Sequence, residues 1–214
     1  MRPSASLNGA AGPNRSEREA LRILVVYAHP LETSYLSAVH AQAVETLRRG
    51  GHDVDDLDLY KERFDPVLSP GQMRAYVDAG ENWREVESYV ERLRAADALV
   101  LVFPVWFDGL PAIMQGYFQR VFLPGVATVI DANGLFHPNL RNLKRMAAVC
   151  TYGEIRADVA KKYDPPRRFV QGNIGALIEP HSPFEYLALY GMDFSTASRR
   201  AAFLKRVARA FSAW

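Results

Sequence analysis

Two large aromatic side chains, Trp106 and Phe107, lie in a stretch whose prolines and Gly109 mark it as a loop. Aromatic rings are costly to expose to water, so the pair predicts either a pocket in the protein's own core or a planar ligand that covers the rings. A flat heteroaromatic ring suits this loop, because backbone amides can bond its polar edge and Gly109 permits a close approach. An apolar plug that packs on the next helix or on a second subunit remains the alternative.

A second segment whose residues could bind a ligand is the turn HPLETS at residues 29–34. It ends in Thr33 and Ser34, so hydroxyl oxygens, backbone amides and the positive end of a helix dipole meet where a phosphate can bind. His29 can add a ring N–H or a positive charge. The alternative is that Thr33 or Ser34 only caps a helix. The turn lacks the glycine pattern of a Rossmann site and the G-K-[ST] of a P-loop, which argues against both sites.

The cysteine and the histidines of the chain do not indicate a catalytic thiol or a metal site. Cys150 ends a buried apolar run with no histidine placed to lower its thiol pKa, which favours a core thiol over a nucleophile. His52, His137 and His181 lack metal-ligand spacing, so no metal site is predicted.

Strands alternate with helices along most of the chain. Apolar, β-branched runs predict five strands, at residues 22–28, 52–60, 98–103, 145–151 and 185–190. Apolar residues at helical spacing predict helices near residues 36–47, 83–93 and 112–122, and a last helix capped by Ser195. The alternation indicates an α/β domain with a doubly wound, five-stranded parallel sheet of order 2-1-3-4-5 and helices on both faces.

In such sheets, ligands bind outside the carboxyl ends of the strands, at the point where the strand order reverses. The loops that follow strands one, three and four are residues 29–34, residues 104–111 and the segment from Thr151 onward. Both candidate segments belong to this set, so we expect them to meet at one edge of the sheet.

Composition sets the broad class of the protein. The chain has 214 residues, 49% of them apolar, which is enough for one sizeable core. No apolar run approaches the ~20 residues that span a bilayer, so we predict a soluble protein without membrane insertion. Residues 1–20 lack the apolar centre of a secretory signal and are predicted to be a disordered leader before a single domain at residues 21–214. A lone cysteine excludes an intramolecular disulfide and fits a reducing cytoplasm.

Charge excludes one class of partner. The net charge of +2 is too small to indicate nucleic acid as the main partner. The basic pairs at residues 161–162 and 167–168 favour a solvated surface, with a contact to a nucleotide phosphate as the alternative.

Three stretches together carry a resemblance to a known family. They are YAHP with TS after the first strand, DLY followed by FDP at residues 58–66, and FPVWFDGLPAIMQGYFQRVFLPG at residues 103–125. The chain resembles the NAD(P)H dehydrogenase (quinone) family of flavodoxin-like proteins, which includes DT-diaphorase, bacterial modulators of drug activity and ancillary reductases of potassium efflux systems. The resemblance runs from about residue 22 to residue 211 and implies a flavodoxin-like three-layer sandwich.

The resemblance also implies site residues. The family's phosphate-binding turn corresponds to His29, Thr33, Ser34 and Tyr35. The segment that lines the flavin ring corresponds to Pro104, Val105, Trp106 and Phe107. The family's Thr-Thr-Gly-Gly loop appears as Cys150 followed by Thr151, Tyr152 and Gly153. Tyr152 and Gly153 are the candidates for the reactive side of the flavin, although Tyr152 can equally pack on residues 165–166.

The chain departs from the family pattern at several positions. Gln115 replaces the usual lysine, Leu36 replaces an asparagine, and Tyr152 replaces a glycine beside the ring. Residues 126–130 lack the tyrosines that larger members place over the substrate. Substrate specificity is therefore not copied from those members.

The function implied by the resemblance is a flavin-dependent NAD(P)H oxidoreductase. It takes a hydride from NADH or NADPH onto flavin N5 and passes it to a quinone or similar acceptor in a ping-pong scheme. FAD is preferred over FMN because of the HPLETS turn. Family members form homodimers, and we expect the contact surface on the helix that carries Tyr117, Phe118 and Phe122.

Two other functions stay open. A flavodoxin-type electron carrier is disfavoured, because such carriers are strongly acidic and this chain carries +2. A flavin-binding regulatory subunit of a membrane transport system is the third possibility.

Overall fold

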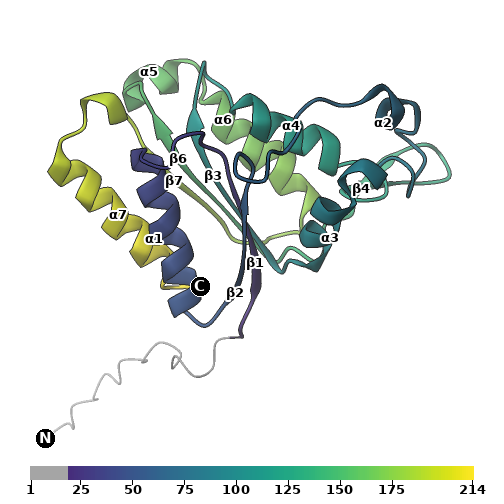
Figure 1. The fold of residues 1–214 in the computed structure, drawn as a ribbon, viewed down its shortest axis with the longest axis horizontal. Coiled ribbons are helices and arrows are strands. Elements are labelled where there is room, and N and C mark those ends of the chain that lie inside the picture. Colours follow the sequence, from purple (N-terminus) through teal and green to yellow (C-terminus); the bar gives the residue numbers. More distant parts are fainter. Residues whose placement is uncertain (1–18) are drawn as a thin grey trace, which may run out of the picture.

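The computed structural model describes residues 19–214, which fold around a five-stranded parallel sheet (Figure 1). The strand order is β2-β1-β3-β6-β7, which confirms the predicted order 2-1-3-4-5. Every neighbouring pair in this sheet runs parallel. In chain order the strands are β1 (Arg22–Tyr27), β2 (Asp53–Asp58), β3 (Ala98–Val105), β6 (Arg145–Tyr152) and β7 (Phe184–Leu189).

Helices cover both faces of the sheet. Helices α1 (Tyr35–Arg49) and α7 (Ala197–Phe211) pack against each other on one face, to the left of the sheet in Figure 1. The other face is covered by α3 (Glu87–Ala95), α4 (Ala112–Val121) and the continuous helical run of α6 (Pro165–Arg168) and the π-helix η3 (Phe169–Ile174). The shorter helical elements are α2 (Pro70–Arg74), η2 (Arg84–Val86), α5 (Arg156–Lys161), η4 (Gly175–Leu177) and η5 (Met192–Phe194).

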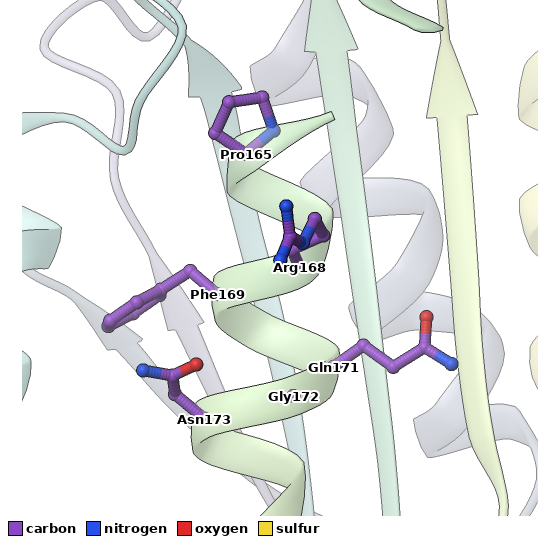
Figure 2. A pocket seen from close by; sticks show the side chains of 6 residues that line it. All are labelled: Pro165, Arg168, Phe169, Gln171, Gly172 and Asn173. Carbon is purple, nitrogen blue, oxygen red and sulfur yellow. The ribbon is translucent and has the colours of Figure 1, made fainter. Parts of the chain in front are cut away.

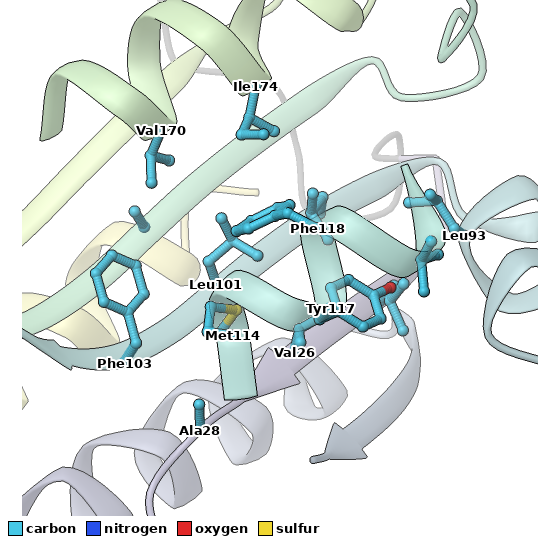
Figure 3. Close-up of a cluster of buried hydrophobic side chains, with 14 of the residues drawn as sticks. Val26, Ala28, Leu93, Leu101, Phe103, Met114, Tyr117, Phe118, Val170 and Ile174 are labelled. Carbon is cyan, nitrogen blue, oxygen red and sulfur yellow. The ribbon is translucent and has the colours of Figure 1, made fainter. Parts of the chain in front are cut away.

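The core consists of two apolar layers, one on each side of the sheet. Because both faces are covered, the inner strands β1, β3 and β6 are mainly apolar, and successive side chains point to opposite layers. In β1, Leu24 and Val26 join the layer beneath α4, whereas Ile23 and Val25 join the layer beneath α1. Figure 3 shows the first layer, with Leu101, Phe103, Met114, Tyr117, Phe118, Val170 and Ile174. Full burial of each large side chain contributes roughly 1.5–3 kcal/mol.

The expected dimer surface on α4 is wrong. Tyr117 is fully buried and Phe118 is 5% exposed, and both belong to the chain's own core. Phe118 and Phe122 pack edge to face at 4.9 Å between ring centroids. The aromatic face of α4 therefore packs against the sheet and is not available to a partner. The prediction failed because apolar residues at i, i+4 spacing are typical of a core-facing helix as well as of an interface helix.

Side-chain caps fix the starts of the two long helices. Ser34 caps α1, with its Oγ accepting the Ser37 N–H at 3.1 Å. The predicted cap of the last helix, Ser195, is wrong by one residue: Thr196 accepts the Arg199 N–H at 3.2 Å. Ser195 instead donates its hydroxyl hydrogen to the Met192 carbonyl at 2.6 Å, which closes the η5 turn ahead of the helix.

Two features of the strands go beyond the sequence prediction. Strand β3 continues through Pro104 and Val105, which pair with Thr151 and Tyr152 of β6. A central strand tolerates Pro104 because β1 has already ended, its last contact being the bond from the Ala28 N–H to the Val102 carbonyl. An antiparallel pair, β4 (Thr128–Ile130) and β5 (Phe136–Pro138), was not predicted, because each strand is only three residues long.

The predicted leader, residues 1–20, lies almost entirely outside the described residues, and Glu19 and Ala20 are exposed. None of the helices in the described part of the chain is long and apolar enough to cross a membrane.

Candidate functional site

Two adjoining cavities open at the carboxyl ends of β1, β3 and β6. The large cavity has a volume of about 480 Å³ and the small cavity about 160 Å³. Four residues line both of them: Val105, Trp106, Gly153 and Asp193. The two cavities therefore share one wall, at the edge of the sheet where doubly wound folds bind ligands.

The cavities gather nearly all of the predicted site residues. The small cavity is further lined by His29, Ser34, Tyr35, Leu36, Pro104, Thr151 and Met192. The large cavity is further lined by Phe107, Asp108, Tyr152 and Glu154. Among the predicted residues, Thr33 alone lines neither cavity, and its side chain is exposed.

The loop after β3 is a tight hairpin that presents two aromatic rings. Trp106 and Gly109 exchange backbone hydrogen bonds of 3.1 and 3.0 Å. The two residues between them, Phe107 and Asp108, have φ angles of 53° and 57°, as in a type I′ turn. Trp106 is 43% exposed and Phe107 is fully exposed, so neither ring is a plug in the core of this chain.

Backbone strain accompanies this exposure. Type I′ turns favour Asn-Gly, and a left-handed conformation costs other residues about 1–2 kcal/mol each. Phe107 has both an unfavourable backbone conformation and a ring without protein contacts that would offset the cost. Such strain is typical of ligand clamps, because binding contacts can be made only in the strained geometry.

Lys162 ties the hairpin to the loop after β6. Its Nζ lies 2.9 Å from Asp108 Oδ2 and 2.7 Å from Glu154 Oε1. Hydrogen bonds to Glu154 and Asp108 raise the pKa of Lys162, so the ammonium stays charged at neutral pH. Lys162 is exposed, in keeping with the predicted solvated face, and its ion-pair partners come from the hairpin after β3 and from the loop after β6.

The turn after β1 offers neutral polar groups to the small cavity. The Leu31 N–H donates to His29 Nδ1 at 3.1 Å, and burial lowers the pKa of His29, so its ring is neutral at pH 7 with Nε2 as the remaining donor. Ser34 caps α1, and the first-turn amides of Tyr35 and Leu36 have no carbonyl within the helix to bond. The first turn of α1 contains no acidic residue.

Tyr35 contributes to this cavity while its phenol anchors another helix. The Tyr35 hydroxyl donates to the Arg200 carbonyl at 2.8 Å, and burial raises the Tyr35 pKa to about 12. The hydroxyl is therefore engaged with α7, and the start of α1 is held in place beside it.

Tyr152 lines the large cavity but its hydroxyl is bound on the far side. The hydroxyl donates to Asp164 Oδ1 at 2.6 Å and lies 2.5 Å from the hydroxyl of Tyr186. The ring stacks on Tyr190 at 4.6 Å and is 2% exposed. Asp164 directly precedes Pro165, so the phenol lies at the start of α6, and burial raises its pKa well above the usual value.

Gly153 leaves room for a carboxylate. A Cβ at this position would lie 2.7 Å from Asp193 Oδ2, so a side chain there would displace this carboxylate. The Gly191 N–H donates to the Glu154 carbonyl at 2.6 Å and so joins the loops that follow β6 and β7. A bare backbone at residue 153 is therefore part of the shared wall.

Cys150 is a core thiol, as predicted. It is fully buried at the end of β6, and burial raises its pKa to about 12. Within residues 19–214 no group of three or more histidine, cysteine or acidic side chains could hold a metal ion.

The sequence prediction missed the contribution of the loop after β7. Met192 and Asp193 line the small cavity, and Asp193 and Glu154 line the large one. The prediction considered only the loops after strands one, three and four. The rule that ligands bind outside the carboxyl ends of the strands could have identified this loop, because the segment GMD at residues 191–193 follows the last predicted strand.

A third hollow, of about 540 Å³, lies on the outer side of α6 and η3. Figure 2 shows its lining side chains fanning out from one helical run: Pro165, Arg168, Phe169, Gln171 and Asn173, with Gly172 between them. It is larger than either cavity at the sheet edge, but one helix supplies all of it and its one charged residue is Arg168. The convergence of loops from four strands makes the sheet edge the better candidate site.

Comparison with known proteins identifies a family model and several relatives that the chain matches. A family model described as the flavodoxin-like fold matches residues 21–210. The chain is similar to NAD(P)H dehydrogenase (quinone) 1 of Cavia porcellus, with 32% identity over 148 residues, covering 62% of this chain and 54% of that protein. It is also similar to the uncharacterized NAD(P)H oxidoreductase YcaK of Escherichia coli K12, with 34% identity over 111 residues, 50% of this chain and 55% of that protein. The chain spans about half the length of the curated relatives it matches.

A solved structure confirms the fold over a greater length. The NAD(P)H:quinone oxidoreductase from Methanothermobacter marburgensis superimposes with a TM-score of 0.79, covering 91% of this chain and 98% of that one. Its sequence is 24% identical, so this likeness establishes the architecture alone.

Proposed function

The chain belongs to the flavodoxin-like fold family, and we propose that it is a flavin-dependent NAD(P)H oxidoreductase with a quinone or similar small acceptor. The observation that carries the proposal is the divided cleft at the sheet edge. A small cavity at a helix N-terminus adjoins a larger one with an exposed aromatic wall. This division matches a cofactor with a phosphate at one end and a flat ring at the other.

The small cavity fits the phosphate end of a flavin. Ser34, the free amides of Tyr35 and Leu36, and the Nε2 donor of His29 all face a site at the positive end of the α1 dipole. The first turn of α1 has no acidic residue, and the one acidic residue of the lining, Asp193, belongs to the wall shared with the large cavity.

The shared wall fits the ring. Trp106 offers an exposed aromatic surface, and Gly153 leaves the backbone bare where a side chain would block a flat ligand. When bound, a flavin accepts a hydride at N5 from NADH or NADPH and gives it up to the acceptor. We infer that the protein's own part is to orient both reactants and exclude water, since no side-chain acid or base is required.

Tyr152 and Gly153 have different proposed roles at the reactive side. The Tyr152 hydroxyl is bound to Asp164, so its side chain positions the loop after β6 and does not exchange a proton with substrate. Gly153 lies in the wall itself, where its backbone amide can bond the polar edge of the ring.

A ping-pong scheme suits this geometry. The large cavity is the space that adjoins the aromatic wall, and its volume of about 480 Å³ holds one ring-sized reactant at a time. Donor and acceptor would therefore occupy the same place in turn.

We further propose FAD as the flavin, from the HPLETS turn, with FMN as the alternative, and a homodimer working in the cytoplasm. Support for the dimer comes from three exposed rings: Phe107 lines the large cavity, and Phe194 and Tyr163 directly follow Asp193 and Lys162 in the chain; all three are more than two-thirds exposed. Light scattering of the purified protein would report the mass in solution.

The deciding experiment is the visible spectrum of the purified protein, with NADH and NADPH added in turn under anaerobic conditions. Flavin bands that bleach on addition, and that recover when a quinone follows, are the expected result. Heat release then identifies FAD or FMN. A protein that is colourless and takes up neither flavin would overturn the proposal. Bleaching without turnover on any acceptor would favour a regulatory subunit or an electron carrier.

A further inference from the structure

The rim of the large cavity carries an excess of negative charge. Three of its lining residues are acidic: Asp108, Glu154 and Asp193. Among residues 19–214, Lys162 is the cation that forms ion pairs with this rim, and it is shared between Asp108 and Glu154. Three carboxylates therefore face one ammonium, which leaves two negative charges without a matching positive charge.

Asp193 is the carboxylate that lacks a partner. It forms no hydrogen bond or ion pair with any other residue in the described range 19–214. Two arginines of α7 direct guanidinium hydrogen bonds to backbone carbonyls and form no ion pair with Asp193: Arg199 donates to the Tyr190 carbonyl at 2.7 Å and Arg200 donates to the Ser195 carbonyl at 2.5 Å. The Asp193 carboxylate is thus available to a ligand.

The position of this carboxylate is fixed by the loops around it. Asp193 Oδ2 lies directly against the bare backbone of Gly153, in the wall that both cavities share. The hydrogen bond from the Gly191 N–H to the Glu154 carbonyl holds the two loops together. A carboxylate without a protein partner thus lies in the wall beside the space for the acceptor.

The apolar walls of the large cavity strengthen the electric field of these carboxylates. Val105, Trp106 and Phe107 present apolar surface, which screens a charge far less than water does. Clefts lined by one sign of charge and apolar walls concentrate the field and so attract or repel small ions.

We propose that Asp193, together with Glu154 and Asp108, makes the large cavity select its acceptor by charge, favouring neutral and cationic acceptors over those with a carboxylate, sulfonate or phosphate group. The inference rests on the proposed function and adds the class of substrate to it. Asp193 is the main specificity-determining residue, because Lys162 neutralises part of the charge of the other two.

The test uses three benzoquinones that share one ring and differ at the end of a short alkyl chain, which is a hydroxyl, a carboxylate or a trimethylammonium group. The shared ring keeps the reduction potential nearly constant. We expect kcat/KM for the acceptor to decrease in the order cation, neutral, anion, by about tenfold from cation to anion at low salt. Raising the ionic strength should shrink that ratio severalfold, because salt screens the rim.

The Asp193→Asn variant keeps the shape and removes the charge, so the ratio of cation to anion should decrease about threefold to tenfold, mainly through KM. Glu45→Gln is the matched control. It removes one negative charge from the exposed far end of α1, about 16 Å along the helix from Ser34, and should leave the ratio unchanged. The salt dependence of the wild-type ratio needs no variant and stands even if Asp193→Asn does not fold.

Equal kcat/KM for the three quinones in the wild type, or a ratio that Asp193→Asn leaves unchanged, would overturn the inference. The rate at which NADH bleaches the bound flavin is measured on the same samples. If NADH bleaches the flavin normally but kcat/KM does not depend on the charge of the acceptor, only the proposed charge selectivity is wrong. If NADH does not bleach the flavin, the proposed oxidoreductase function is wrong.

Discussion

The two cavities at the sheet edge are formed by different kinds of structure. The small cavity is formed at the start of a long helix, and its lining is uncharged apart from Asp193 in the shared wall. Ser34, Tyr35 and His29 each have a hydrogen-bond partner within the protein. The large cavity is formed by loops, with two residues in left-handed conformations, a shared ion pair at Lys162 and an unpaired carboxylate at Asp193.

This difference separates binding of the proposed cofactor from choice of the acceptor. Helix amides and a capping hydroxyl come with the fold itself, so any chain with this sheet and α1 can hold a phosphate there. Charges on loops can change without altering the fold, so the large cavity is where specificity can vary. Variants on the two sides should therefore have separable effects on flavin affinity and on acceptor kinetics.

The largest effect should come from Asp164→Ala, which removes the anchor behind the large cavity. Asp164 accepts hydroxyl hydrogens from Tyr152 and Tyr190 and caps α6. Loss of a charged acceptor and a cap should lower the free energy of unfolding by about 3 kcal/mol in urea denaturation. Asp158→Ala, which loses an exposed pair with Lys161, should change it by less than about 0.5 kcal/mol. Similar values for both variants would show that the tyrosine cluster does not hold this side together.

Trp106→Ala tests the shared wall. Without the indole, the proposed flavin should bind about tenfold to thirtyfold more weakly in a fluorescence titration, because an aromatic stacking surface is lost. Phe136→Ala removes a ring of similar exposure from β5, away from the cleft, and should leave flavin affinity unchanged. Wild-type affinity in Trp106→Ala would make the hairpin after β3 a structural feature only.

Ser34→Ala and Thr196→Ala form a matched pair on the small-cavity side. Both remove a capping hydroxyl from a 15-residue helix, and each should lower the free energy of unfolding by about 1 kcal/mol. Ser34→Ala should in addition weaken flavin binding by about 1 kcal/mol, measured in the same titration. If the two variants bind flavin equally well, Ser34 serves the helix alone.

Phe107→Asn should separate stability from function in the large cavity. Asn tolerates a positive φ better than Phe does, so the free energy of unfolding should rise by about 0.5 kcal/mol while acceptor kcat/KM decreases severalfold. Phe194→Asn replaces another strongly exposed ring, at ordinary φ, and should give no such gain in stability. A loss of stability in Phe107→Asn would mean that the turn is not strained.

The smallest effect concerns pH. Burial lowers the pKa of His29 in the folded state, so the unfolded chain binds more protons as the pH falls below about 6.5. The contribution of His29 is therefore fully present above that pH and is lost as the pH falls from about 6.5 through the folded-state pKa. His29→Asn should show a weaker loss of stability over this range in urea denaturation at several pH values. An unchanged slope would place the pH dependence at other groups.

The strands and main helices were predictable because local pattern and tertiary structure agree there. Apolar runs such as residues 98–103 suit only a sheet covered on both faces, and Ser34 at the start of a periodic stretch predicts the helix that follows. The β4–β5 pair was not predictable, because three-residue strands leave too short a pattern to recognise.

Errors arose where one pattern fits two environments. The stripe on α4 fits both a core and a dimer interface, and only packing beneath the sheet shows that Tyr117 and Phe118 are core residues. Lys162 is exposed as predicted, but its ion pair with Asp108 was not predictable, because Asp108 lies 54 residues away in the chain.

The sequence by itself determined the strands, the main helices and the segments that follow the strands, because hydrophobic periodicity and turn residues are local properties that survive without tertiary contacts. The alternation of strands and helices then fits the doubly wound order 2-1-3-4-5. The tertiary structure decided the site's electrostatics and its free and engaged groups: the hydroxyl of Tyr152 is bound, the carboxylate of Asp193 is free, and Lys162 is shared. These properties depend on distances between loops that are far apart in the chain, and such distances are set only when the two apolar layers close around the sheet.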